Sequence, residues 1–252
     1  AVWYMKERPR KYGLAYEILR KAEAKKHPDA GAMIGSLMEK KKLGTIPSTE
    51  EITKLYKESC DMASPDGMYH MATFYHYGND YEEANTNEAV RLYTLAAKNE
   101  NDNQGAAVLS LSVLYEELGQ NDKAFEIANF YRGQDMFQGY ARCADLYERG
   151  IGVMKNIKAS KECMKIAKEP RFVKEQMITG LLYSRAKGVP RDKQKAFFWS
   201  EISAKNGSPS GQANIASYYL DGFGCKPNID LAEEWAIKSS EQGNDHACMI
   251  LA

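Results

Sequence analysis

The sequence has no excess charge of either sign and no long apolar run. Its 252 residues carry 34 Lys and Arg against 34 Asp and Glu, so the formal net charge is zero. This balance disfavours a nucleic-acid binder, which usually carries a basic excess that neutralises phosphates. No stretch approaches the length of a membrane-spanning helix, which needs about 18 consecutive apolar residues. With 44% hydrophobic and 27% charged residues, the composition is that of a globular protein.

The sequence also lacks the motifs of catalysis and of metal binding. It contains no nucleophile motif such as Gly-x-Ser-x-Gly. His70 and His76 are six residues apart, so on a helix they lie on different faces and do not form a metal pair. The Gly-x-Gly stretches at 150–152 and 222–224 lack the third glycine of a dinucleotide-binding loop. We therefore expect no enzymatic activity, no catalytic residue, no metal and no cofactor.

Cysteine is scarce and irregularly spaced. The five cysteines form no Cys-x-x-Cys motif, and their number is odd: Cys60, Cys143, Cys163, Cys225 and Cys248. A disulfide framework is not expected in a chain that can bury a sizeable core. Cys143 and Cys163 are candidates for contact across one helix pair, but spacing does not decide whether they pair. We expect small buried hydrophobes, which favours a reducing compartment such as the cytoplasm and leaves a secretory or organellar route open.

Most of the chain is organised by a repeat. Tyr183 and Tyr219 are 36 residues apart, and so are Trp199 and Trp235. Extending this offset gives six repeats over 30–246, which start at residues 30, 67, 107, 139, 175 and 211. A fixed period of about 20–50 residues is the signature of stacked structural units. The ends do not complete the pattern. We expect a partial repeat at 1–29 with its second helix at about 11–26, and a truncated seventh repeat at 247–252.

Four columns of similar residues recur in these repeats. The first column is small: Gly35, Ala72, Ser112, Ala144, Gly180, Ala216 and Ala252. Three residues later comes a large residue, mostly Tyr: Met38, Tyr75, Tyr115, Tyr147, Tyr183 and Tyr219. A second column, small apart from its second member, holds Ala15, Ile52, Ala89, Ala124, Ser160, Ala196 and Ala232. An apolar column follows it: Ile18, Leu55, Leu92, Ile127, Cys163, Trp199 and Trp235.

This spacing predicts pairs of helices. Small residues let two helices approach closely, while the large residue fills the space toward the next pair. Because one helix pair cannot bury its apolar face alone, the pairs must stack. The sequence therefore predicts an all-α, right-handed α-solenoid of stacked antiparallel helix pairs.

The segments between the helices carry turn and capping residues. Glycines of the Gly-x-Gly stretches supply positive φ at helix ends. Asp192 and Asn228 are placed to cap the helices that follow. Ser48, with Glu51 three residues later, has the spacing of a capping box. These signals place the helix ends independently of the columns.

The pattern small-x-x-Tyr-x-x-Gly-x-Gly-Val, then Lys-Ala-x-x-Trp, then Gly, resembles the Sel-one-like repeat, a relative of the tetratricopeptide repeat. The residues that carry the resemblance are Tyr147, Gly150, Gly152, Val153, Tyr183, Gly188, Val189, Lys195, Ala196, Trp199, Gly207, Tyr219, Gly222, Gly224, Ala232, Trp235 and Gly243. The resemblance implies an adaptor or scaffold that binds a protein or peptide within a larger assembly. A cysteine-rich branch of the family pairs cysteines eight residues apart. Met68 stands where that second cysteine would follow Cys60, so this pairing is not carried over.

By analogy with tetratricopeptide-like solenoids, the first helix of each pair lines a concave groove. Positions three before, one after and four or five after the first small column would face this groove. The candidate partner-binding residues are Tyr69, Thr73, His76, Tyr77, Glu116, Glu117, Asp145, Glu148, Arg149 and Arg185. Aromatic side chains of this kind are enriched at binding hot spots, and the carboxylates suit a basic or mixed peptide. The alternatives are a regulatory subunit or weak hydrolase of the repeat family, and a helical-repeat nucleic-acid binder that zero net charge disfavours.

Overall fold

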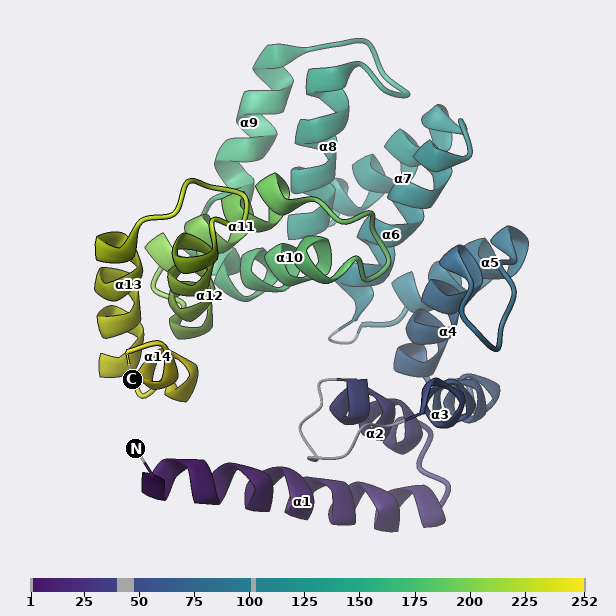
Figure 1. Ribbon diagram of the computed structural model, residues 1–252. Helices are drawn as coiled ribbons and strands as arrows, with labels where there is room; N and C mark the ends of the chain where they lie inside the picture. Colours follow the sequence, from purple (N-terminus) through teal and green to yellow (C-terminus); the bar gives the residue numbers. More distant parts are fainter. Residues whose placement is uncertain (1, 40–47, 101–102, 252) are drawn as a thin grey trace. The chain divides into compact units, whose positions relative to one another are not determined.

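The protein is built from helices joined by short loops (Figure 1). The structure is a computed structural model and describes residues 2–39, 48–100 and 103–251; no strand occurs within these ranges. Within each of the two units described below, most consecutive helices pack against each other, and they run antiparallel (Figure 1). The prediction of an all-α solenoid of helix pairs is confirmed. The chain divides into two compact units, residues 1–107 and 108–252, which we call the first and the second unit.

The first unit begins with a long helix. Its helices are α1 (Val2–Ala24), α2 (Ala30–Glu39), α3 (Thr49–Asp61), α4 (Pro65–Tyr77) and α5 (Thr86–Ala97). Each of them packs on the next. The helix predicted at about 11–26 begins earlier, at Val2, because helical hydrogen bonding extends beyond the small and apolar columns on which the prediction rested.

The second unit contains the most regular repeats. Helix α6 (Gln104–Glu117) crosses the boundary between the units. It is followed by α7 (Asn121–Gly133), α8 (Phe137–Arg149), α9 (Ile157–Ala167), the 3-10 turn η1 (Pro170–Phe172), α10 (Val173–Arg185), α11 (Lys193–Lys205), α12 (Pro209–Asp221), α13 (Ile229–Glu241) and α14 (Asp245–Ile250). Ala252, assigned to the first small column, lies outside the described residues. The division into six repeats stays a prediction.

The small columns are the places where paired helices touch. From Gly35 to Ala216, every member of the first column is buried, and so is every member of the second column from Ile52 to Ala232. A Cβ atom on Gly180 would lie 2.5 Å from Ser200 Oγ and 3.2 Å from the Ala196 carbonyl oxygen. The close approach of α10 and α11 therefore depends on the missing side chain of Gly180.

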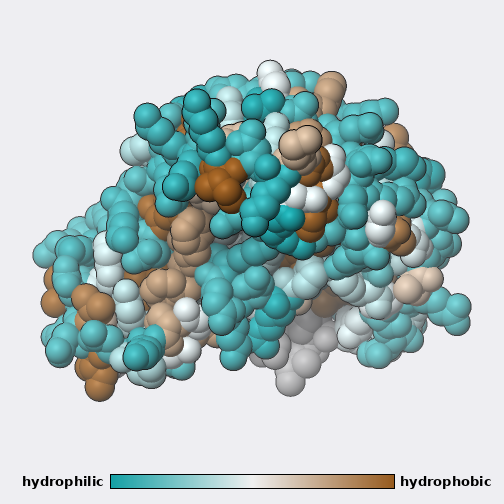
Figure 2. Space-filling model, turned by 90° about the horizontal axis from the view of Figure 1, so that it is seen from above, coloured by the Kyte–Doolittle hydropathy of each residue, from teal (hydrophilic) through white to brown (hydrophobic). Residues whose placement is uncertain are grey.

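The large columns are less buried than predicted. Tyr183 is buried, but the other tyrosines of its column, Tyr75, Tyr115, Tyr147 and Tyr219, are half-buried. In the apolar column Trp199 is 5% exposed, whereas Trp235 is half-buried and Ile18 is 57% exposed. A tyrosine can lay its ring on the core while its hydroxyl reaches water, so these positions line the edge of each helix pair. The surface seen from above the view of Figure 1 is largely hydrophilic, with scattered apolar patches (Figure 2).

The predicted caps and turns form. Ser48 Oγ accepts a hydrogen bond from the Glu51 amide at 3.1 Å, and Asp192 Oδ1 accepts one from the Lys195 amide at 2.8 Å. Gly152 and Gly224 both have positive φ, of 63° and 74°. A Cβ atom on Gly224 would lie 2.1 Å from the Lys193 carbonyl oxygen, so this loop packs directly on the helix pair before it. Gly224 is therefore needed for two reasons: it allows the turn, and it allows the close contact between two consecutive helix pairs.

The five cysteines differ in burial: Cys143 and Cys163 are buried, Cys60 and Cys225 are half-buried, and Cys248 is exposed. Cys143 and Cys163 are free thiols buried in one apolar cluster between α8 and α9, together with Ala128 and Leu146. Burial raises the pKa of the Cys143 thiol to about 12. These two are the small buried hydrophobes that were predicted. The prediction is wrong for Cys248, which is exposed in the short terminal helix α14.

Candidate functional site

The candidate residues of α4 do not share one environment. Tyr69 is 1% exposed and lies against the rings of His70 and Tyr93. The prediction that Tyr69 is a surface anchor is therefore wrong. Residues 69 and 72 lie one helical turn apart on one face, and the helices that cover Ala72 also cover Tyr69. Of the equivalent residues in the later repeats, Leu109, Ala141 and Ala213 are buried, and Met177 is half-buried.

His76 and Tyr77 form an aromatic pair at the C-terminal end of α4. Their rings stack, with centroids 4.0 Å apart and an interplanar angle of 19°. Tyr77 is 45% exposed and His76 is half-buried. Thr73 Oγ1, one turn before, donates to the Tyr69 carbonyl oxygen at 3.1 Å and lies 3.3 Å from the Tyr93 hydroxyl. Of the aromatic candidates, only this pair offers ring surface to a partner.

Two of the charged candidates, Glu116 of α6 and Asp145 of α8, converge on one arginine that the sequence analysis missed. Arg142 is 3% exposed and forms ion pairs with Glu116 on α6 and, at 2.7 Å, with Asp145 on α8. Its Nε donates to Ser112 Oγ at 3.0 Å, and Ser112 Oγ donates to the Ala124 carbonyl oxygen at 2.8 Å. The guanidinium thus connects two consecutive helix pairs through a residue of the first small column.

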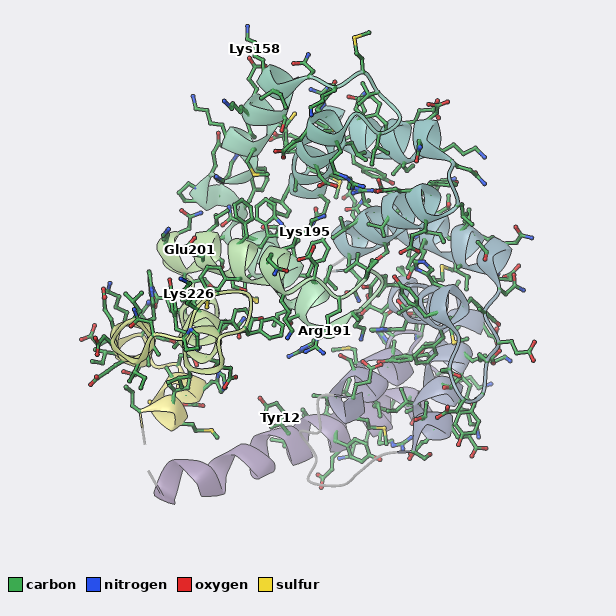
Figure 3. All side chains as sticks on the ribbon, turned by 45° about the horizontal axis from the view of Figure 1, so that its top comes forward. Tyr12, Lys158, Arg191, Lys195, Glu201 and Lys226 are labelled. Carbon is green, nitrogen blue, oxygen red and sulfur yellow. The ribbon has the colours of Figure 1, made fainter. Side chains whose placement is uncertain are left out.

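Arg149 closes this network from the solvent side. It pairs with Glu116 and, at 3.1 Å, with Asp145, and its side chain is 43% exposed. Lys195 of α11 reaches the other oxygen of Asp145 at 3.5 Å (Figure 3). We call Glu116, Arg142, Asp145, Arg149 and Lys195 the charge network. It joins side chains from three consecutive helix pairs of the second unit.

The network holds its carboxylates ionised. Burial alone would raise the pKa of Glu116. Hydrogen bonds and positive charges from Arg142 and Arg149 lower this pKa by more than burial raises it, so the net shift is downward. For Asp145 burial also raises the pKa, and the charges of Lys195, Arg142 and Arg149 outweigh it. Glu116 and Asp145 are therefore not free charges at the surface, because each already binds two or more cations. The partner-binding role of the carboxylates stays a prediction.

The remaining candidates lie outside the network. Glu117, Glu148 and Arg185 are exposed near the C-terminal ends of α6, α8 and α10. Arg142 escaped sequence analysis because the groove positions transferred by analogy do not include it. Its spacing was a usable signal, since Asp145 and Arg149 follow it at three and seven residues on the same face of a helix.

Among the described residues, no three His, Cys, Asp or Glu side chains are grouped to hold a metal ion. None of the helices that the structure describes is both long enough and apolar enough to span a membrane.

Comparison with known proteins agrees with the fold. The structure resembles a protective antigen of uropathogenic Escherichia coli with an SLR fold, at a TM-score of 0.53 and 22% identity; the match covers 92% of this chain and 50% of that one. It also resembles a Sel1 repeat protein from Oxalobacter formigenes, at a TM-score of 0.50 and 21% identity, over 92% of this chain and 67% of that one. This chain thus spans half the length of the Escherichia coli antigen.

The sequence itself matches the model of the Sel1 repeat. The matched stretches are 65–101, 138–169, 176–208 and 209–244, which together make up more than half of the chain. They cover all or most of the helix pairs α4–α5, α8–α9, α10–α11 and α12–α13. Both Gly-x-Gly turns lie in these stretches, and so do eight members of the two small columns: Ala72, Ala89, Ala144, Ser160, Gly180, Ala196, Ala216 and Ala232. The chain belongs to the Sel1 repeat family.

Proposed function

We propose that the protein is an interaction scaffold that binds a protein or peptide along the first helices α6, α8 and α10 of its second unit. The observation that carries this proposal is the charge network. Five charged side chains from three helix pairs meet there, and Arg149 keeps 43% of its side chain exposed while it binds two carboxylates. Sel1 repeat proteins are commonly interaction scaffolds, which agrees with this use of the surface.

The network suits binding because its side chains are already ordered. A partner that contacts a fixed guanidinium does not have to immobilise a flexible side chain, which otherwise costs about 0.5–1.5 kcal/mol. Arginine is also among the residues enriched at binding hot spots. The surrounding Glu117, Glu148 and Arg185 are exposed and of both signs. We therefore propose a partner segment with mixed charge, whose carboxylate lies on Arg149 and whose cation lies near Glu148.

Site-specific photo-crosslinking tests this proposal. A benzophenone side chain is placed at Glu148 in one variant and at Glu233, an exposed residue of α13, in a matched control. Proteins crosslinked in an extract of the source cells are identified by mass spectrometry. We expect one protein to be captured from position 148 and not from position 233.

The captured protein is then purified, and its affinity is measured for Arg149→Ala and for the control Glu233→Ala. We expect Arg149→Ala to weaken binding by about 1–2 kcal/mol and Glu233→Ala to leave it unchanged. Equal capture from both positions, or equal affinity of both variants, would contradict a binding face on the first helices.

A further inference from the structure

A row of lysines lies on helix α9, in the layer of second helices, away from the charge network. Lys158, Lys161 and Lys165 are exposed and follow each other at three and four residues, so they share one face over about 10 Å. Figure 3 shows Lys158 at the outer end of α9, directed away from the neighbouring helices. We call these three residues the α9 lysine row.

The lysine row differs in its pairing from one exposed lysine in each of three other second helices. In α3, α11 and α13, one such lysine binds a carboxylate four residues away: Lys54–Glu58 at 3.9 Å, Lys205–Glu201 at 2.9 Å and Lys238–Glu234 at 2.6 Å. Within the described part of the chain, no member of the lysine row forms an ion pair. Glu162 is the sole carboxylate of α9, and the first turn of this helix has no acidic residue. The row therefore leaves positive charge uncompensated next to a helix N-terminus.

The row borders a hollow with an apolar end. This hollow is a shallow, largely open depression of about 480 Å³ on the face of α9, lined by the three lysines together with Ile157 and Glu162. Ile157 is 43% exposed, and Met154 in the loop before it is 87% exposed. Apolar and cationic side chains thus lie side by side over this end of the helix.

We propose that α9 carries a second docking surface, which binds an acidic peptide segment. Carboxylates of the segment lie along Lys158, Lys161 and Lys165, and an apolar side chain lies on Ile157 and Met154. Charge complementarity selects the acidic segment, because the three lysines are exposed and form no ion pair among the described residues. The exposed apolar area is too small to anchor a membrane by itself, and the zero net charge of the chain disfavours nucleic acid. This inference does not depend on the function proposed for the first helices.

The experiment measures binding of a fluorescein-labelled peptide of four Glu-Glu-Leu repeats to the full chain by fluorescence anisotropy, at low ionic strength. The test variant is Lys158→Gln/Lys161→Gln/Lys165→Gln. The matched control is Lys54→Gln/Lys205→Gln/Lys238→Gln, which removes the same charge from exposed, already paired positions of other second helices. We expect the test variant to bind about tenfold more weakly and the control to change by less than about twofold. Equal loss in both triple variants would overturn the proposal, because binding would then follow net charge alone.

A second comparison tests the apolar end of the surface. Met154→Ser should weaken binding of the Glu-Glu-Leu peptide and leave binding of a Glu-Glu-Ser peptide unchanged. Vesicles of phosphatidylcholine with phosphatidylserine, and a uridine oligonucleotide, are measured in parallel. Tighter binding of either one, with the same dependence on the lysine row, would overturn the assignment to an acidic peptide. Thermal melting of each variant checks that the loss of binding is not a loss of folding.

Discussion

Arg142 shows how strongly a single side chain can join neighbouring repeats. It is 3% exposed and binds Glu116, Asp145 and Ser112. Removing a buried partner of an ion pair is costly because the other charges stay behind without compensation. We expect Arg142→Ala to lower the free energy of unfolding by about 2–4 kcal/mol, and Arg149→Ala, which is 43% exposed, by less than about 1 kcal/mol. Urea denaturation measures both values, and similar losses would show that Arg142 is not the centre of the network.

The carboxylates of the charge network should make the fold sensitive to acid. The pKa values of Glu116 and Asp145 are lowered in the folded state from ordinary values of 4.5 and 3.8. A carboxyl group whose pKa is lowered on folding stabilises the protein above its unfolded pKa, and this stability is lost as the pH falls through the folded pKa. We expect stability to be constant from neutral pH down to about pH 5 and to fall below that. The measurement is urea denaturation at a series of pH values. The double variant Glu116→Gln/Asp145→Asn should show a shallower acid loss, and an unchanged slope would contradict this assignment.

The two tryptophans of the apolar column should differ in their effect on stability. Trp199 is 5% exposed and packs edge-on against Phe137 and Phe198, whereas Trp235 is half-buried beneath Lys238. We expect Trp199→Ala to cost about 3–5 kcal/mol and Trp235→Ala about 1–2 kcal/mol. Thermal melting of the two variants measures both losses of stability. The repeat pattern alone would suggest equal losses, because both tryptophans occupy the same column.

At the scale of elements, glycine controls how closely one helix pair approaches the next. Gly224 and Gly243 both have positive φ, of 74° and 76°. A Cβ atom at 224 would lie 2.1 Å from the Lys193 carbonyl oxygen, while at 243 it would meet nothing within 4 Å. Gly243→Ala is thus a matched control, because its side chain strains a backbone of positive φ in the same way but does not clash with a neighbouring atom.

We expect Gly243→Ala to cost about 1 kcal/mol, which is the strain of a left-handed residue with a side chain. Gly224→Ala should cost at least about 2 kcal/mol more, because the loop has to move away from α11. Urea denaturation checks both values. Equal losses of unfolding free energy in the two variants would mean that the loop of 222–228 can shift without separating the helix pairs.

At the scale of the whole molecule, a solenoid has mainly nearest-neighbour contacts. Its stability is then close to a sum over helix pairs and the interfaces between consecutive pairs. The division into two compact units agrees with this view. Damage in one unit should therefore remain largely local.

Hydrogen exchange followed by mass spectrometry tests this locality. In Gly224→Ala we expect faster exchange in α11, α12 and α13 and unchanged protection in α4 and α5. Faster exchange throughout the chain would indicate that both units unfold as one cooperative body.

Much of the fold was open to prediction from the sequence, because its signals are local or periodic. The small columns predicted the helix-to-helix contacts, and from Gly35 to Ala216 the first column is buried throughout. Ser48, Asp192 and Asn228 predicted three helix starts, since a capping side chain bonds to amides only three residues away. The family resemblance rested mainly on the recurring tyrosines, glycines and tryptophans of residues 147–243, and it is confirmed by the matched stretches.

The candidate site depended on contacts between residues far apart in the sequence. The sequence by itself determined that α4 carries aromatic side chains at both ends and that α9 carries lysines at helical spacing. Only the tertiary structure decided that Tyr69 is buried while Tyr77 is 45% exposed. It also decided that Arg142, 26 residues from Glu116, holds that carboxylate while the lysines of α9 stay unpaired among the described residues. Helical periodicity places a residue on a face, but the neighbouring helices determine whether that face is covered and which charges meet there.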